Sequence, residues 1–504
     1  MSKTPEPGQW QRTSPLAVLF FFGKVINLII KNAWQSLAPL AAFAVAYQGD
    51  IVETAAIAGG AMFMLIGAAA ILRYWFFRFQ LNPDAILIRQ GVIKKSQLDI
   101  KFDRIQGINT QQNIIYRYLD LVTVSFETAG SAGDEGSLPA VHRELATSLR
   151  ERIRGPLSGT PAADQRSEAA APQEPLLTLD WRDIIRIGLS DKRALVLVAL
   201  IGPLLERAGD SVERKIADLI DSGIREAPEF GILPGALIIV GLVLGVLLLL
   251  ALASVAAAFW RYHNFELRLD SDTLRSTGGL LTRHEVSMGL DKIQTLRLEQ
   301  GPILRWFRRF RMTARQARSS HRNDSDKNFA IPVVTGEEAS HLRELFMEDE
   351  GRDLVQIPES GRFQSISPYY MRSRVIVSTL IPLTLGAVLF PLGRDPAVFL
   401  PLLLVAPVIF LIYRTWRHAG YLYTDEGLVR RSGTIGYRTV ALLYRKVQRV
   451  TVTQSPLQRR KGLATLRVYM ASGSVRLPYI RHDLARQLRD YILFKVESNQ
   501  QAWH

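Results

Sequence analysis

The chain is 504 residues long and contains no cysteine, and its 62 Lys and Arg residues against 47 Asp and Glu residues give a net charge of +15. The absence of cysteine excludes a disulfide framework, thiolate zinc and iron–sulfur sites, and a cysteine nucleophile. At roughly 150 residues per domain, the length predicts about three domains. The positive charge favours anionic partners, either membrane lipid or nucleic acid.

Long uncharged apolar runs alternate with arginine-rich segments. Five runs are close to or above the ~20 residues that a helix needs to cross a bilayer: residues 32–49, 54–72, 231–260, 375–393 and 396–413. The short loops QGDIVE (48–53) and GRDPA (393–397) are mainly acidic, whereas basic and aromatic residues such as RYWFFRF follow the paired runs. This asymmetry predicts that the segments after each pair are cytoplasmic.

A sixth apolar run, residues 194–205, has only 12 residues. It must cross the bilayer if the middle arginine-rich block is to share the cytoplasmic side with the other two. If this run does not cross, the middle block lies outside. We therefore expect about six transmembrane helices arranged in three hairpins.

An amphipathic segment precedes the first apolar run. In residues 16–31, Lys24, Asn27 and Lys31 fall on one face of an otherwise apolar helix. Similar segments lie at 179–193 and 367–374, and all three are typical of helices that lie in the membrane interface. The alternative, that residues 16–31 belong to one long first span, stays open.

Three segments share one spacing of basic residues and glutamines. They are RIQGINTQQNIIYR (104–117), DKIQTLRLEQGPILR (291–305) and RKVQRVTVTQSPLQR (445–459). Each contains a glutamine pair six residues apart, and a glycine lies fifteen residues before the first glutamine of each pair. The pairs are Gln106 and Gln112, Gln294 and Gln300, and Gln448 and Gln454, and the glycines are Gly91, Gly279 and Gly433.

The sequence around each motif predicts the same small α+β unit. Short alternating apolar runs surround the glycine, which is typical of β-hairpins whose turn needs positive φ. A proline ends the last run of each block at Pro139, Pro332 or Pro478, and a helical pattern follows it. We predict antiparallel strands closed by one C-terminal helix.

A membrane hairpin followed by such a unit resembles the bacterial pleckstrin-homology-like (PH-like) membrane proteins of the YdbS/YdbT type, in their three-copy form, over about residues 14–497. The resemblance implies a PH-like fold, a multi-pass location in the cytoplasmic (inner) membrane and no enzymatic activity. It implies no particular ligand. The predicted membrane hairpins are 14–76, 179–262 and 367–416, the first two beginning with an interfacial helix. The predicted PH-like domains are 77–154, 263–350 and 417–498. Linkers are predicted at 155–178 and 351–366.

Basic residues are the best candidates for contact with anionic head groups, because arginine binds phosphate through two parallel hydrogen bonds. The alternative is a solvated or salt-bridged strand face. The motif glutamines are expected to be structural, bonded to turn backbone. The predicted head-group contacts are Arg104, Arg117, Lys292, Arg305, Arg308, Arg309, Arg311, Lys446 and Arg459.

Catalytic patterns are absent from the sequence. His284–Glu285 lacks the second histidine of a zinc protease, and no phosphate-binding glycine loop occurs. We therefore expect no catalytic residue, metal or cofactor.

The favoured function is a non-enzymatic membrane scaffold that presents PH-like domains to anionic phospholipid or to partner proteins, with envelope maintenance or protection as one setting. It is expected to work as a homo-oligomer or with a companion membrane protein of similar build. A transporter or export component and a nucleic-acid-binding membrane protein are the alternatives.

Overall fold

A computed structural model describes residues 8–31, 51–92, 95–128, 136–154, 174–191, 218, 222, 233–270, 272–316, 329–347, 363–393 and 405–498. The predicted spans at 32–49 and 194–205 lie outside these residues, as do most of both predicted linkers.

Each repeat contains two small antiparallel sheets, which we call its N-sheet and its C-sheet. The N-sheets contain β1 (Arg78–Leu81), β2 (Ala85–Gln90) and β3 (Ser96–Lys101) in repeat 1, β7 (Leu177–Thr178), β8 (Glu266–Asp270), β9 (Thr273–Gly278) and β10 (Thr282–Gly289) in repeat 2, and β14 (Gln364–Ser365), β15 (Gly420–Tyr423), β16 (Gly427–Ser432) and β17 (Tyr437–Leu443) in repeat 3. The C-sheets contain β4 (Ile105–Asn113), β5 (Leu121–Thr128) and β6 (Ser137–His142) in repeat 1, β11 (Thr295–Gln300), β12 (Phe310–Arg315) and β13 (Phe329–Val334) in repeat 2, and β18 (Val447–Thr453), β19 (Leu463–Met470) and β20 (Gly473–Arg481) in repeat 3.

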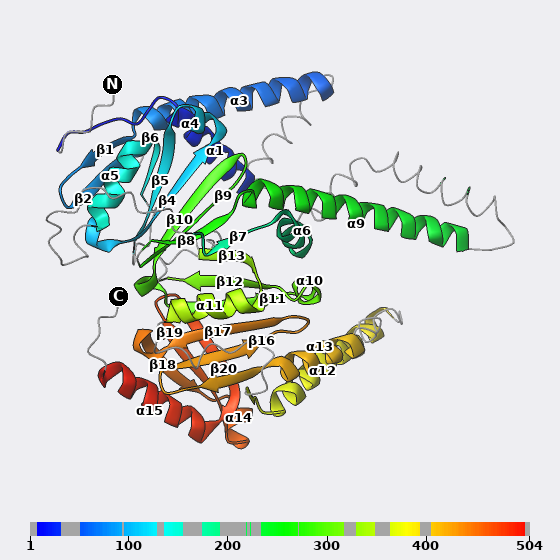
Figure 1. Ribbon diagram of the computed structural model, residues 1–504. Coiled ribbons are helices and arrows are strands. Elements are labelled where there is room, and N and C mark those ends of the chain that lie inside the picture. Colours follow the sequence, from blue (N-terminus) through cyan, green and yellow to red (C-terminus); the bar gives the residue numbers. More distant parts are fainter. Residues whose placement is uncertain are drawn as a thin grey trace.

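The C-sheet of one repeat joins the N-sheet of the next. Strand β4 pairs with β10, and β11 pairs with β17, so that two seven-stranded sheets run through the molecule and a three-stranded sheet remains at each end (Figure 1). The sequence pattern treats the three blocks as separate units. The structure shows that consecutive repeats are joined by continuous hydrogen-bonded sheets, at places that we call the first and second joints.

Both joints have the same register. Gln112 lies opposite Arg283 at the first joint, and Gln300 lies opposite Tyr437 at the second. Counted from the motif glutamines, these are equivalent pairs. Since a slip of one residue would turn every side chain to the wrong face, the shared register shows that the two joints are the same interface used twice.

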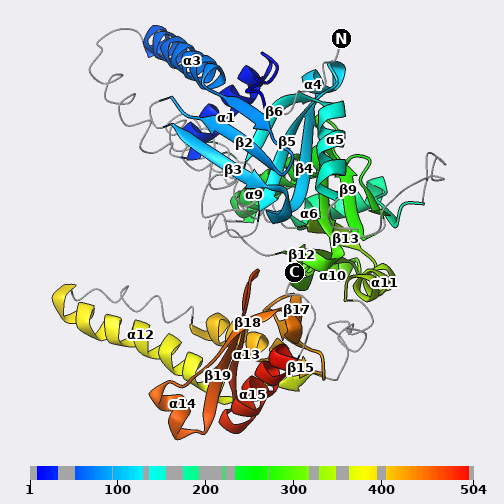
Figure 2. The same ribbon diagram turned by 90° about the vertical axis from the view of Figure 1, so that its left-hand side faces the viewer.

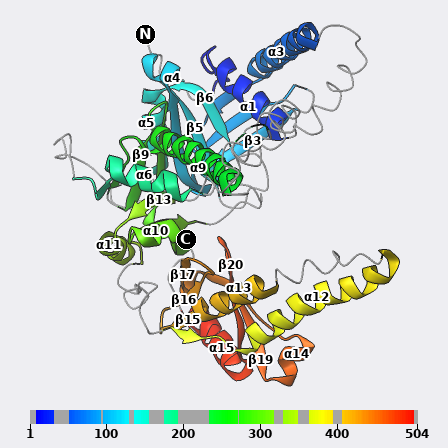
Figure 3. The same ribbon diagram turned by 90° about the vertical axis from the view of Figure 1, so that its right-hand side faces the viewer.

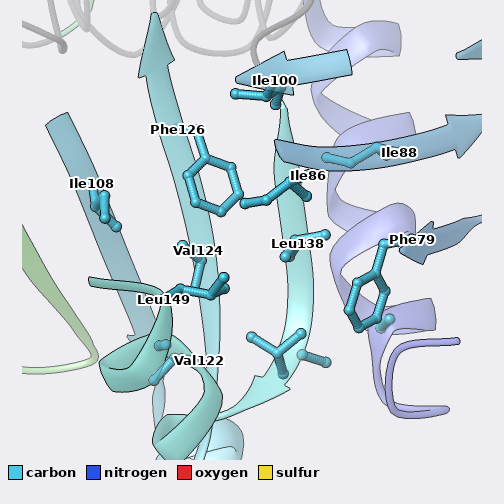
Figure 4. Packing of buried hydrophobic residues seen from close by; sticks show 14 of the residues in the cluster. Phe79, Ile86, Ile88, Ile100, Ile108, Val122, Val124, Phe126, Leu138 and Leu149 are labelled. Atoms are coloured by element: carbon cyan, nitrogen blue, oxygen red, sulfur yellow. The ribbon is translucent and has the colours of Figure 1, made fainter. Parts of the chain in front are cut away.

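A helix covers each C-sheet: α5 (Arg143–Arg154), α11 (Gly336–Met347) and α15 (His482–Ser498). Figure 4 shows the core of repeat 1, in which Phe126 of β5, Leu138 of β6 and Leu149 of α5 are all buried in one cluster. In repeat 2 the core also takes residues from the following repeat, because Ala441 and Leu443 of β17 belong to it. The second joint is therefore closed by apolar side-chain packing as well as by backbone pairing.

Three turn glycines adopt the left-handed conformation that the sequence pattern requires of them. Gly91, Gly279 and Gly433 have φ angles of 106°, 116° and 142°. A Cβ atom at Gly279 would also collide with the backbone carbonyl of Thr282. Each glycine allows the tight turn that leads into the next strand of its N-sheet: β3, β10 or β17.

The remaining long helices are α1 (Ala17–Lys31), α3 (Ile51–Trp75), α6 (Trp181–Ser190), α9 (Leu233–Tyr262), α12 (Tyr369–Gly393) and α13 (Val405–His418). In Figure 1, α3, α9 and the α12–α13 pair project from the sheets on one side. Within the described residues, one helical segment is long and apolar enough to cross a membrane, Val243–Tyr262, and Ala17–Ile26 and Gly59–Trp75 form shorter apolar stretches.

Candidate functional site

The second glutamine of each motif is directed into the protein. Gln112 Nε2 donates to the Leu121 carbonyl at 2.9 Å, and Gln454 Nε2 makes the equivalent bond to the Leu463 carbonyl at 2.7 Å. Gln300 is buried as well. In repeats 1 and 3 this side chain therefore fastens the first strand of the C-sheet to the residue that begins the next strand.

The first glutamine lies where the strand pairing shifts by one residue. Shifts occur between Ile105 and Gly107 and between Val447 and Arg449, on either side of Gln106 and Gln448. Gln448 is exposed, whereas Gln294 is buried and its backbone N–H donates to the Arg315 carbonyl at 2.7 Å. In repeats 1 and 3 the first glutamine thus marks a β-bulge.

The motif arginines contact the following repeat at the joints. They lie on three short helices, α4 (Ile114–Tyr118), α10 (Pro302–Trp306) and α14 (Pro456–Arg460). Arg117 Nη2 donates to the Leu280 carbonyl at 3.3 Å, and the Arg305 guanidinium lies 4.9 Å from the centre of the Tyr437 ring. Arg459, in the last repeat, is exposed.

The basic residues that begin the motifs differ from one repeat to the next. They end the short 3₁₀ helices η1 (Phe102–Arg104), η3 (Leu290–Lys292) and η7 (Tyr444–Lys446). Arg104 is exposed, and Lys292 pairs with Asp291 at 3.0 Å. The prediction of a head-group contact is wrong for Lys446, because it is 5% exposed and its Nζ donates at 2.7 Å to the carbonyls of Asp291 and Ile293.

The remaining predicted arginines surround α10. Arg308 is exposed, Arg311 is half-buried, and Arg309 lies 3.6 Å from the carboxylate of Asp183 in α6. Arg186 of α6 pairs with the same carboxylate at 2.6 Å and lies over the Phe307 ring. Ionic and cation–π contacts therefore hold α6 against α10.

Helix α6 has two apolar faces. Its inner face, with Ile184 and Ile187 buried, packs on α9 and α10. Contact with α9 is close, because the Ser254 hydroxyl donates to the Gly188 carbonyl at 2.6 Å and a Cβ atom at Gly188 would lie 2.5 Å from the Val255 Cα atom. The helix therefore lies flat against the membrane-length helix, one to two turns before its end at Tyr262.

The outer face of α6 and the adjoining face of α10 form an exposed surface that is both apolar and basic. We call it the α6–α10 surface, and Figure 3 shows where these two helices lie. Trp306 is 86% exposed and Trp181 59% exposed. Arg182, Arg305 and Arg308 are the exposed cations. Its other exposed apolar members are Ile185, Leu189, Ile303 and Phe307, and Phe259 and Trp260 are exposed near the end of α9.

Repeat 1 has a related surface. Ala17, Phe21 and Val25 of α1 are buried, whereas Lys24 is exposed. Its α4 helix exposes Ile114, Ile115 and Tyr118, the last at 91%. In repeat 3 the short helix exposes Leu457 alone among its apolar residues. Among these short helices, only α10 exposes a tryptophan, Trp306.

A cavity of about 460 Å³ lies at the first joint. Its charged lining consists of Arg143, Arg150, Arg268, Arg275 and Arg283 with Glu151, Glu266 and Glu285. Glu285 of β10 binds Arg150 of α5 at 3.0 Å and Arg275 at 3.3 Å. These ion pairs neutralise part of the charge and hold α5 to the incoming strand.

The sequence analysis did not identify the exposed apolar residues that α6 contributes to the α6–α10 surface. It recognised 179–193 as an interfacial segment but did not separate the residues that face α9 from those that face outward. The spacing of Trp181, Ile185 and Leu189 was the available signal. Among the described residues, no group of three or more His, Asp or Glu side chains could hold a metal ion.

Comparison with known proteins agrees with the threefold architecture. The model of the bacterial PH domain family matches residues 25–156, 229–349 and 378–495. The chain belongs to the bacterial PH domain family. It is also 22% identical over 482 residues to the UPF0699 transmembrane protein YdbT of Bacillus subtilis (strain 168), a match that covers 92% of this chain and 93% of that protein. No solved structure matches the chain significantly. The three family matches each include one pair of small sheets, so the joints connect three bacterial PH domains.

Proposed function

We propose that this chain is a non-enzymatic scaffold of the bacterial inner membrane that holds three PH domains against the cytoplasmic leaflet. The observation that carries the proposal is the α6–α10 surface beside the base of α9. Exposed tryptophan is typical of the membrane–water interface, where the ring meets both hydrocarbon and polar groups. The neighbouring arginines would meet anionic phospholipid, with a gain of about 1 kcal/mol for each cation near the surface.

Six spans in three hairpins complete the proposed topology. The described parts of α3, α9, α12 and α13 support it, because these helices project from the sheets on one side (Figure 1). The name of the Bacillus relative, a transmembrane protein, is a second support. With the joints fixing the domains to one another, partner proteins could bind on faces directed away from the bilayer.

The absence of cysteine makes the membrane contact directly testable. We would place a spin label at Trp306→Cys in the full chain, and a control label at Glu344→Cys on the exposed side of α11 in the same repeat. The full chain would be reconstituted in nanodiscs of phosphatidylcholine, with or without phosphatidylglycerol. Relaxation by oxygen reports contact with hydrocarbon, and relaxation by a water-soluble nickel chelate reports contact with water.

We expect the label at 306 to respond to oxygen and the label at 344 to respond to nickel. Arg182→Gln with Arg308→Gln should shift the label at 306 toward water in anionic discs more than in neutral discs. If the label at 306 responds to nickel as strongly as the control in both lipids, the proposed membrane contact is wrong.

A further inference from the structure

The repeated joint leaves two counterpart strands at the ends of the array. Each joint pairs the first strand of a C-sheet (β4 or β11) with the last strand of the next N-sheet (β10 or β17). Two equivalent strands pair on one side only within the described residues. They are β18, the first strand of the last C-sheet, and β3, the last strand of the first N-sheet (Figure 2). Sheet edges with unpaired backbone groups are templates for another strand.

Strand β18 keeps the chemistry of a joining strand. Val450 takes the place of Ile108 and Leu296, which are 5% and 2% exposed inside the joints, yet Val450 is only half-buried. Arg459 takes the place of Arg117 and Arg305, which contact the following repeat. Its side chain is exposed and has no partner among the described residues.

The helix above β18 also carries uncovered apolar surface. At the second joint, Phe346 of α11 shares a core with Ala441 and Leu443 of the incoming strand. On α15, Ile492 takes the place of Phe346 and is buried, but the next two residues, Leu493 and Phe494, are 39% and 63% exposed. An incoming strand of the β17 type would supply apolar side chains of the kind that the core of repeat 2 receives from repeat 3.

Strand β3 differs from the joining strands β10 and β17 at two positions that would face the neighbouring repeat in a joint. Asp99 stands where β10 and β17 have Ser287 and Ala441, which are 8% and 5% exposed in the joints. Lys101 stands where β17 has the buried Leu443 and β10 has the half-buried Gly289. Pairing in the joint register would bury Asp99 opposite Val450, and an unpaired buried carboxylate is strongly unfavourable. Inward-pointing charges of this kind protect an edge strand from pairing.

We propose that β18 is an open docking edge for one further strand from another polypeptide. That strand is the last N-sheet strand of a PH domain, the counterpart of β10 and β17. In this chain, Asp99 and Lys101 prevent β3 from binding there. The partner strand carries a small residue at the position of Ala441 and an apolar residue at the position of Leu443. The array therefore has one closed end and one end that binds a partner of related fold. The two internal joints supply the geometry of the contact.

The register of the joints specifies which residues would meet. Glu299 and Arg438 lie opposite each other at the second joint and form a 2.7 Å ion pair. The equivalent positions are Thr453 on β18 and Ser96 on β3, both exposed. A disulfide between cysteines at these two positions would report pairing in the joint register.

The test converts a second full-length copy into a partner of the required chemistry. The acceptor carries Asp99→Ala, Lys101→Leu and Ser96→Cys, together with Val450→Lys to block its own β18. The donor is the full chain with Thr453→Cys. Both are mixed in detergent, so lipid binding does not enter, and the disulfide-linked product is quantified after mild oxidation.

We expect the linked donor–acceptor pair to form at least about tenfold more than with an acceptor that keeps Asp99 and Lys101. Moving the acceptor cysteine from Ser96 to Gln97, which points to the other face, should abolish the product, as should Val450→Lys in the donor. Unchanged melting temperatures would show that each variant is folded.

Two results would overturn the proposal. Equal cross-linking with the acceptor that keeps Asp99 and Lys101 would mean that a second copy of this chain can pair with β18. Asp99 and Lys101 would then not exclude β3 from this edge. No cross-linking to the folded, uncapped acceptor would mean that β18 is not an open edge.

Discussion

Lys446 of the third repeat donates from its Nζ to the backbone carbonyl of Ile293 in the second repeat, at 2.7 Å, inside the protein. A second bond of the same length reaches the carbonyl of Asp291. One buried cation thus satisfies two carbonyls of the neighbouring repeat, and these bonds hold the second joint together at the start of both C-sheets.

Lys446→Met should destabilise the full chain by about 3 kcal/mol, because two charge-assisted bonds are lost and two carbonyls are left without this donor. The measurement is denaturant unfolding in detergent, followed by tryptophan fluorescence. Lys461→Met, which removes the same charge from an exposed position, is the control. Equal midpoints for the two variants would contradict the structural role of Lys446.

Gln112→Leu and Gln454→Leu should each cost about 1–2 kcal/mol, since each removes a side-chain bond to the carbonyl that opens the next strand. Gln448→Leu alters an exposed side chain and should stay within about 0.5 kcal/mol of wild type. Comparison of the three unfolding midpoints checks this prediction. A large effect at Gln448 alone would show that the first glutamine, not the second, supports the fold.

Gly188→Ala should loosen α6 from α9, because the added methyl group meets the Val255 backbone. Overpacking of this kind costs about 1–3 kcal/mol. A spin label at Ile185→Cys should become more mobile in the variant. Gly245→Ala, on the same α9 helix but with open space around it, is the matched control and should leave the label unchanged.

Tyr444 should make stability fall at high pH. Burial, followed by nearby Tyr491, raises the pKa of Tyr444. An acid whose folded pKa is raised contributes stability that is present below its unfolded pKa, ~10, and is lost as pH rises above it. Tyr444→Phe should therefore reduce the loss of melting temperature between pH 9 and pH 11, measured against wild type.

The same substitution should cost little at neutral pH. The Tyr444 hydroxyl is buried and has no hydrogen-bond partner in the described structure, so its removal leaves no new unsatisfied group. A drop of more than about 1 kcal/mol at pH 7 would indicate a bond that the described contacts do not include.

Local patterns in the sequence predicted the repeated unit well, because they encode local geometry. The glycine fifteen residues before each motif marks a turn that only positive φ allows, and the proline that ends each block precedes the covering helix. The joints could not be predicted in this way. Nothing near Gln112 indicates that its strand will pair with Arg283, some 170 residues later.

The basic motif positions show the same limit. Arg104, Lys292 and Lys446 look equivalent in sequence, yet one is exposed, one forms a local ion pair, and one is buried at a joint. Their surroundings are set by which strand arrives from another repeat. Equal spacing identified the fold but could not assign the same role to all three residues.

The shared register of the two joints has a consequence for how such chains can change length. Since β17 fits β11 in the same alignment in which β10 fits β4, a chain that lost its middle repeat would bring β17 to β4 without a shift in pairing. A chain that gained a repeat would add one more equal joint. The array can therefore grow or shrink by whole repeats while its two end strands stay the same.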